Sequence, residues 1–196
     1  MAHGPTYKVP FRRRREGKTD YRVRKKLVMS KKPRLVIRKS LKHLYLQLIE
    51  VKVNGDVVLA QANTKELSKY GWKGGTGNLP AAYLAGLLLG KRALSKGIKN
   101  AILDLGRYSI TKGNRLFAAL KGALDAGMDI PHSEEILPDE ERIKGAHIAK
   151  YAIILQKENP SKYQAHFSNY IRMNLPPEKI VEHFEEIKNK IIKEVV

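Results

Sequence analysis

The feature that most constrains the fold is a run of four arginines, Arg12–Arg15, near the N-terminus. Arginine is almost never fully buried unless it is paired, and the only acids within residues 1–42 are Glu16 and Asp20. This segment therefore cannot contribute to a hydrophobic core, and the chain must build its core from the residues that follow. The arginines either stay solvated or meet an external polyanion.

The positive charge of the chain is concentrated at the same end. Residues 1–42 hold 16 of the 38 lysines and arginines and 2 of the 19 acids, so they carry +14 and the remaining residues +5 of the formal net charge of +19. Phe11 and Tyr21 flank the arginines, which suits nucleic acid because bases stack on aromatic rings while phosphates pair with guanidinium groups. We interpret the segment as an arm laid along RNA; a solubilising or targeting tail is the alternative.

The composition excludes several classes of protein. Hydrophobic residues make up 42% of the 196 residues, which favours a folded domain over disorder. The chain has no cysteine, which excludes disulfides and thiolate metal sites and fits a reducing compartment. No apolar segment of a signal peptide follows the charged N-terminus, and the longest apolar stretch, around 81–89, is too short to span a bilayer. We therefore expect a cytoplasmic protein without a membrane partner.

The chain is expected to consist of three parts, which are a basic RNA-binding arm with a short helix at 1–32, an α/β core at 33–131 and a helical C-terminal extension at 132–196. Residues 1–20 carry glycines and prolines among their charges, which predicts no regular structure. Residues 21–30 fit a short helix, which must end before Pro33 because the residue before proline avoids the α region.

The core is predicted to be an α/β fold with a mixed sheet. Alternating or β-rich segments predict consecutive strands at 34–39, 43–53 and 56–62. Asn54-Gly55 favours a tight hairpin, so these strands form an antiparallel meander. A short apolar run at 101–105 fits a strand covered on both faces, and the helix before it implies a right-handed crossover onto a parallel neighbour.

Five segments are predicted to be helical: 79–96, 114–126, 142–157, 161–173 and 177–195. Asn78 is the expected cap of the first of these helices, and Gly97 is its expected stop. Five acids between Ser133 and Glu141 precede the C-terminal helices. The last helix carries one apolar stripe, expected to dock on the core or on a neighbouring protein, formed by Ile180, Phe184, Ile187, Ile191 and Val195.

A glycine-rich segment, Gly71–Asn78, opens the helix at 79–96, where free backbone amides can bind an anion. Lys73 precedes the inner glycines and does not follow them, so a nucleotide-binding P-loop is not indicated. A phosphate contact to RNA and a plain structural turn remain open for this segment. Trp72, the only tryptophan, either stacks on a base or packs in the core.

Asp104 at a strand end suggests a nuclease, the main alternative to a binding protein. Metal-dependent phosphoryl transfer needs several converging carboxylates, and the other strands offer only Glu50 and Asp56. We therefore expect Asp104 to cap a turn or to pair with Arg107. The six histidines are scattered, and the serines lack a nucleophile elbow, so no catalytic residue, metal site or cofactor is expected. A DNA-compacting protein is a further alternative, which a structured core and a single arm support poorly.

Several segments resemble one known family. The segment from Phe11 to Tyr21, continued by Arg24–Leu27, is similar to the N-terminal signature of the L-eighteen family of large-subunit ribosomal proteins in its archaeal and eukaryotic form. The resemblance covers nearly the whole chain, with further matches at 81–92, 112–127, 130–133 and 167–171. The length and the C-terminal extension are typical of archaeal members.

The resemblance implies a non-enzymatic protein that binds 5S rRNA, helps attach it to the large subunit in the central protuberance, and also touches 23S rRNA and neighbouring ribosomal proteins. Arg12–Arg15 and Lys18 are expected to bind phosphates, and Phe11 and Tyr21 to stack on bases. The complete set of expected RNA-contacting residues is Phe11, Arg12, Arg13, Arg14, Arg15, Lys18, Tyr21, Arg22, Arg24, Lys25, Lys26, Trp72 and Lys73.

Overall fold

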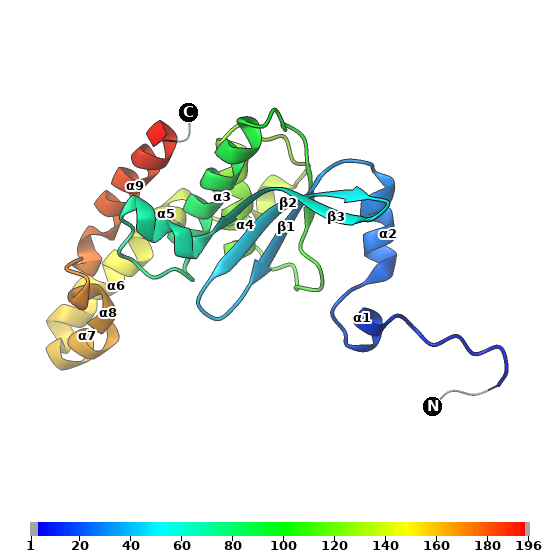
Figure 1. Ribbon diagram of the computed structural model, residues 1–196. Helices are drawn as coiled ribbons and strands as arrows, with labels where there is room; N and C mark the ends of the chain where they lie inside the picture. Colours follow the sequence, from blue (N-terminus) through cyan, green and yellow to red (C-terminus); the bar gives the residue numbers. More distant parts are fainter. Residues whose placement is uncertain (1–3, 195–196) are drawn as a thin grey trace.

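The computed structural model, which describes residues 4–194, is built around a four-stranded mixed sheet with strand order β3-β2-β1-β4 (Figure 1). The strands β1 (Arg34–Lys39), β2 (Leu44–Lys52) and β3 (Gly55–Asn63) form an antiparallel meander. The fourth strand, β4 (Ile102–Asp104), runs parallel to β1. The predicted α/β fold, with a meander and one parallel strand after a helical crossover, is confirmed.

Two details of the sheet differ from the expectation. β4 was predicted to be covered on both faces, but it is an edge strand of three residues in which only Asp104 is buried. The turn between β2 and β3 consists of Val53 and Asn54, and Gly55 already pairs with Lys52. Because Gly55 is already part of β3, the predicted turn at Asn54-Gly55 is wrong by one residue. The positive φ of 133° falls on Gly55.

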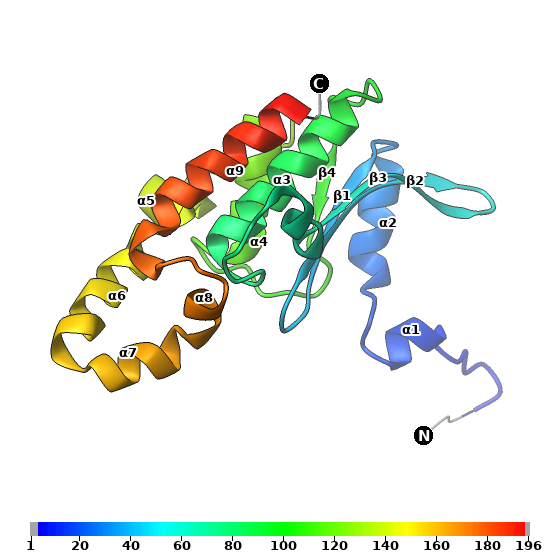
Figure 2. The same cartoon turned by 60° about the vertical axis from the view of Figure 1, so that its left-hand side comes forward.

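The helices α3 (Leu79–Leu94) and α4 (Arg115–Asp125) pack on one face of the sheet, and the helix α2 (Tyr21–Met29) lies on the other (Figure 2). The Asn78 side chain accepts a hydrogen bond from the backbone N–H of Ala81 at 3.0 Å, which caps α3. Asn114 caps α4 in the same way. Both predicted helices are confirmed.

The two core helices approach each other through glycines. A Cβ atom built on Gly86 of α3 would overlap the carbonyl oxygen of Ala119 on α4. A Cβ built on Gly122 of α4 would overlap the carbonyl oxygen of Tyr83 on α3. The backbones of α3 and α4 can therefore approach this closely only because these two positions carry no side chain.

The segment after β3, for which no helix was predicted, contains a 3₁₀ helix, η1 (Thr64–Tyr70). The Asn63 side chain accepts a hydrogen bond from Lys65 N at 2.9 Å and starts this helix. Leu67 is fully buried and anchors it. A single apolar anchor produces no periodic pattern, which is why the sequence did not predict a helix here.

The C-terminal part contains more and shorter helices than predicted. Gly145, with a φ of 86°, divides the helix expected at 142–157. The helix expected at 161–173 is divided near Phe167, whose backbone leaves the helical range. The observed helices are η2 (Glu134–Ile136), α5 (Glu140–Lys144), α6 (Ala146–Glu158), α7 (Pro160–His166), α8 (Ser168–Arg172), η3 (Pro177–Lys179) and α9 (Ile180–Glu194).

The apolar stripe of α9 docks on the core and not on an outside partner. Its four described members are at most 1% exposed and belong to the same hydrophobic cluster as α3, namely Ile180, Phe184, Ile187 and Ile191. Val195, the fifth predicted member, lies outside the described residues. A second small cluster, formed by Ala152, Leu155 and Phe167, holds α6 and α7 together.

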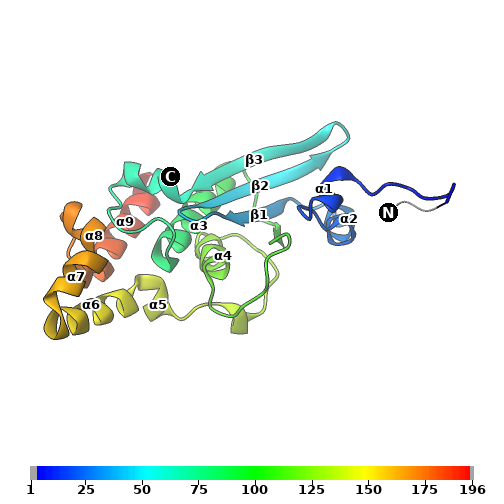
Figure 3. The ribbon, with the colours of Figure 1, turned by 90° about the horizontal axis from the view of Figure 1, so that it is seen from below.

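The N-terminal arm projects from the end of the molecule opposite to the C-terminal helices (Figure 3). It contains a one-turn helix, α1 (Arg12–Arg15), where no regular structure was expected. The predicted helix at 21–30 is confirmed as α2 (Tyr21–Met29). Asp20 caps α2, because its carboxylate accepts hydrogen bonds from the backbone N–H groups of Arg22 and Val23.

Candidate nucleic-acid interface

The four arginines of α1 are all exposed. Successive residues of a helix point about 100° apart, so the guanidinium groups spread around α1 and do not line up as on an extended chain. Their local partners are few: Arg12 lies 3.6 Å from Glu16, and Arg13 donates a hydrogen bond to Thr19 Oγ1 at 2.9 Å. The arm is therefore suited to contact phosphates on several sides at once.

The two aromatic residues that flank the arginines pack against each other. The ring centroids of Phe11 and Tyr21 lie 5.0 Å apart, with their planes inclined by 43°. This contact holds the residue before α1 against the first residue of α2. Phe11 remains 69% exposed, so most of its ring is open to a base, whereas Tyr21 is half-buried.

The predicted cations of α2 fall into two groups. Arg22, Lys25 and Lys26 are exposed. Arg24, in contrast, donates a hydrogen bond from Nη2 to Asp56 Oδ1 on β3 at 2.8 Å. This contact lowers the pKa of the Asp56 carboxyl group and raises the pKa of Arg24. Arg24, one of the residues expected to contact RNA, is therefore paired with a carboxylate of the protein itself.

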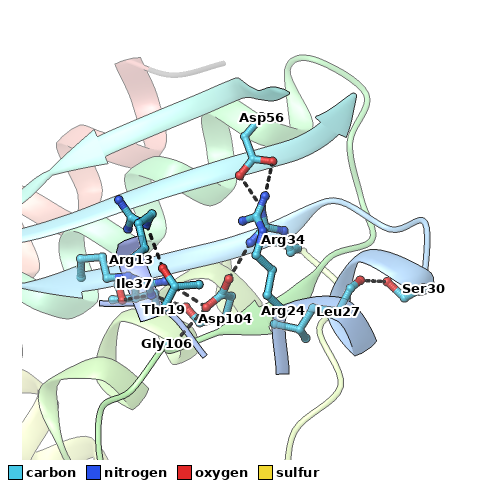
Figure 4. A network of polar contacts seen from close by, with 11 residues as sticks. Arg13, Thr19, Arg24, Leu27, Ser30, Arg34, Ile37, Asp56, Asp104 and Gly106 are labelled. Atoms are coloured by element: carbon cyan, nitrogen blue, oxygen red, sulfur yellow. Dashed lines mark hydrogen bonds and ion pairs between the residues drawn. The ribbon is translucent and has the colours of Figure 1, made fainter. Parts of the chain in front are cut away.

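Arg24 is the first member of a series of alternating charges on the face of the sheet that α2 covers, which we call the outer face (Figure 4). The buried Arg34 donates to Asp56 Oδ2 at 2.8 Å and to Asp104 Oδ2 at 2.7 Å. Arg38 donates to Asp104 Oδ1 at 3.0 Å. This arginine–aspartate chain, which consists of Arg24, Asp56, Arg34, Asp104 and Arg38, joins α2 to strands β3, β1 and β4.

Asp104 has a structural role in this chain. It accepts a hydrogen bond from Gly106 N at 2.9 Å, so the expected turn cap is confirmed. The alternative to this cap was pairing with Arg107, which instead donates a hydrogen bond to the carbonyl oxygen of Gly17 in the arm at 2.7 Å. Two arginines occupy the Asp104 carboxylate, and the described residues contain no group of three His, Asp or Glu side chains placed to hold a metal ion.

A cavity of about 630 Å³ opens between α2, residues 13–20 of the arm and the outer face of the sheet. Its charged lining comprises five cations and three acids, namely Arg13, Lys18, Arg24, Arg34, Arg38, Asp20, Asp56 and Asp104. Lys18, a predicted phosphate ligand, is exposed at its edge and lies 2.9 Å from Glu16. Cations of the arm and of the sheet therefore line the same cavity, where Arg24, Arg34 and Arg38 are paired with aspartates.

The structure does not bring Trp72 and Lys73 to the arm. They follow η1 at the other end of the nine-residue strand β3 (Figure 1), which spans roughly 26 Å between Gly55 and Asn63. Trp72 is only 5% exposed and stacks on His183 of α9, with 5.2 Å between ring centroids. Packing, the alternative to base stacking, is therefore the role the structure assigns to Trp72, whereas Lys73 is exposed.

The glycine-rich segment is held by the C-terminal helices. His183 Nε2 accepts a hydrogen bond from Lys73 N at 3.1 Å, and the hydroxyl oxygen of Tyr170 accepts one from Gly75 N at 3.3 Å. Backbone amides bound in this way are not free for a phosphate. The structure therefore favours the structural turn among the alternatives for this segment.

The contact between His183 and Lys73 requires a neutral imidazole. His183 can accept the proton of Lys73 N only through an unprotonated Nε2. Burial lowers the pKa of His183 below its ordinary value of 6.5, and the nearby Glu186 carboxylate offsets part of this effect. The docking of α9 on the glycine-rich segment is therefore sensitive to protonation of His183.

Acidification is expected to change the fluorescence of Trp72 with a midpoint below pH 6.5, the ordinary pKa of histidine. The unfolded chain takes up the proton at higher pH than the folded chain, so the free energy of unfolding falls as the pH drops below that value. A pH titration of Trp72 fluorescence measures the midpoint. His183→Gln keeps an acceptor but removes the titration, and it should abolish the transition. A midpoint at or above 6.5 contradicts this assignment.

Two comparisons with known proteins find the same family. The model of the family described as ribosomal large subunit proteins 60S L5 and 50S L18 matches residues 5–100 and 95–133. The large ribosomal subunit protein uL18 of the archaeon Caldivirga maquilingensis is 55% identical over 194 residues, which cover 98% of this chain and 94% of that protein. Within residues 4–194, none of the helices has the length and apolarity needed to cross a membrane.

Proposed function

The chain belongs to the family of large-subunit ribosomal proteins that comprises 60S L5 and 50S L18, and on this premise we propose that it binds 5S rRNA and helps attach this RNA to the subunit. Members of the family are structural proteins of the cytoplasmic ribosome and not enzymes. Within the subunit, the proposed place is the central protuberance. The further proposed partners are 23S rRNA and neighbouring large-subunit proteins.

The observation that carries the proposal is the exposed arginine-rich arm. Arg12–Arg15 on α1 and the exposed cations of α2 form a positive surface that projects from the folded core. Arginine presents a planar fork that matches phosphate oxygens, and each neutralised phosphate releases counterions. The exposed ring of Phe11 adds a stacking surface for an unpaired base.

The proposed contact surface is smaller than the set expected from the sequence. It comprises Phe11, Arg12–Arg15, Lys18, Tyr21, Arg22, Lys25 and Lys26. Arg24 is left out because it is bound to Asp56, and Trp72 because it is buried against His183. Lys73 stays a candidate for a separate RNA contact at the other end of the sheet.

Binding to 5S rRNA is expected to weaken steeply with salt. If about 6–8 phosphates are contacted, log K falls with log salt at a slope on the order of −5 to −7. Filter binding at several KCl concentrations measures the slope, with a DNA duplex of equal length as the control. A shallow slope, or equal affinity for the DNA duplex and for 5S rRNA, contradicts the proposal.

A further inference from the structure

The helix α2, which joins the arginine-rich α1 to the core, is attached by few apolar contacts. None of its residues is buried, and Val23 on its apolar side is still 45% exposed. Apolar burial contributes about 25 cal/mol for each Å² removed from water, so it holds α2 only weakly. The orientation of α2 must therefore depend on polar contacts.

Among residues 4–194, two side-chain hydrogen bonds tie this region to the core. Arg107 donates to the carbonyl oxygen of Gly17 before α2, and Arg24 on α2 donates to Asp56. The Asp56 carboxylate is itself fixed, because its second oxygen accepts a hydrogen bond from the Arg34 side chain, which is 3% exposed. Asp56 therefore connects α2 to a buried group of the sheet.

We propose that Asp56 is a positioning residue for RNA binding, which holds Arg24 and thereby keeps α2 and α1 in the orientation that engages 5S rRNA. This inference rests on the proposed function. Both carboxylate oxygens of Asp56 are occupied by arginines, and a carboxylate repels phosphate, so Asp56 acts through Arg24 and not by touching RNA. The same pairing explains why Arg24 differs from its exposed neighbours Lys25 and Lys26.

The proposal and plain electrostatics predict opposite signs for one substitution. Asp56→Asn removes a negative charge close to the positive arm, so long-range electrostatics alone would strengthen binding to a polyanion. If Asp56 positions α2, the variant must instead weaken binding, because the arm then visits many orientations. Affinity falls by the fraction of time spent in the competent one.

The test compares Asp56→Asn with Glu50→Gln. Glu50 is an exposed acid on the neighbouring strand β2, so its substitution makes the same change in charge without touching α2. Asp56→Asn is expected to weaken 5S rRNA binding about 10-fold if α2 is correctly placed one tenth of the time. Glu50→Gln is expected to leave the affinity equal or slightly higher.

Hydrogen exchange without RNA provides a second measurement. In Asp56→Asn the backbone amides of α2 are expected to lose protection, while those of β1 and β2 keep it. Arg24→Gln, which leaves the pair between Asp56 and the buried Arg34 in place, should produce the same loss even if Asp56→Asn fails to fold. Lys25→Gln, which removes an exposed charge from the same helix, should leave the protection of α2 unchanged.

The outcomes separate the inference from the function on which it rests. Wild-type binding with equal or tighter binding by Asp56→Asn overturns the positioning role, as does unchanged exchange of α2 in both Asp56→Asn and Arg24→Gln. Failure of the wild-type protein to bind 5S rRNA overturns the proposed function and the RNA part of the inference. The exchange experiment, which needs no RNA, then still decides whether Asp56 holds α2.

Discussion

Replacing Arg12–Arg15 with glutamine is expected to weaken binding to 5S rRNA about 10²- to 10³-fold at about 0.15 M salt. If each arginine neutralises one phosphate, the slope of log K against log salt should become less steep by about 3 to 4. All four side chains are exposed, so the melting temperature should stay close to that of the wild-type protein. Filter binding over a range of KCl concentrations, together with thermal melting, measures both effects.

The matched control removes the same number of charges from the other end of the molecule. Exposed lysines of the C-terminal helices, replaced together by glutamine, provide it: Lys157, Lys162, Lys179 and Lys193. Both variants lower the net charge equally, so a general attraction between a basic protein and RNA would weaken equally in both. Local phosphate contacts at α1 predict a large loss for the arginine variant and a small one for the lysine variant. Similar losses in the two variants would remove α1 from the proposed interface.

The sheet and the two core helices were predictable because local signals and tertiary structure agree there. The strand predicted at 34–39 matched β1, the expected cap Asn78 matched the start of α3, and the apolar periodicity over 114–126 matched α4. Each of these signals comes from residues that are close together in the sequence. Where intrinsic propensity, hydrophobic pattern and capping residues favour the same element, tertiary packing stabilises the structure that the local sequence already prefers.

The breaks in the C-terminal helices depend on contacts between distant segments. Gly145 ends α5 with a positive φ, and a Cβ built there would lie 3.1 Å from Pro80 and 3.4 Å from Ile180. A glycine inside an apolar periodic segment is compatible with a continuous helix at a cost of about 1 kcal/mol. The sequence alone therefore could not show that packing against α3 and α9 selects the broken form.

The arm was predictable as a basic segment outside the core, but the partner of each of its cations within the protein was not. Composition and aromatic flanks indicated nucleic acid, and nothing in the sequence distinguished Arg24 from Lys25. The distinction comes from Asp56, which lies 32 residues further along the chain and reaches Arg24 across the outer face of the sheet. Trp72 was ambiguous for the same reason, since His183, which covers it, belongs to the last helix.

Gly86→Ala is expected to destabilise the protein by about 3 kcal/mol, although glycine to alanine in a helix interior ordinarily stabilises by about 1 kcal/mol. The added Cβ would overlap the backbone carbonyl of Ala119 on α4, and backbone cannot swing aside as a flexible side chain can. The helices α3 and α4 must separate to accept it. That separation loosens contacts in the largest hydrophobic cluster of the chain.

Denaturant unfolding of Gly86→Ala and Gly97→Ala separates this clash from backbone strain. Gly97 lies after α3 with a φ of 74°, and a Cβ built there meets no atom within 4 Å. Its substitution costs only the left-handed backbone, on the order of 1 kcal/mol. The free energy of unfolding should therefore fall at least twice as far for Gly86→Ala. If Gly86→Ala were as stable as the wild-type protein, backbone contact between α3 and α4 could not be what requires glycine at this position.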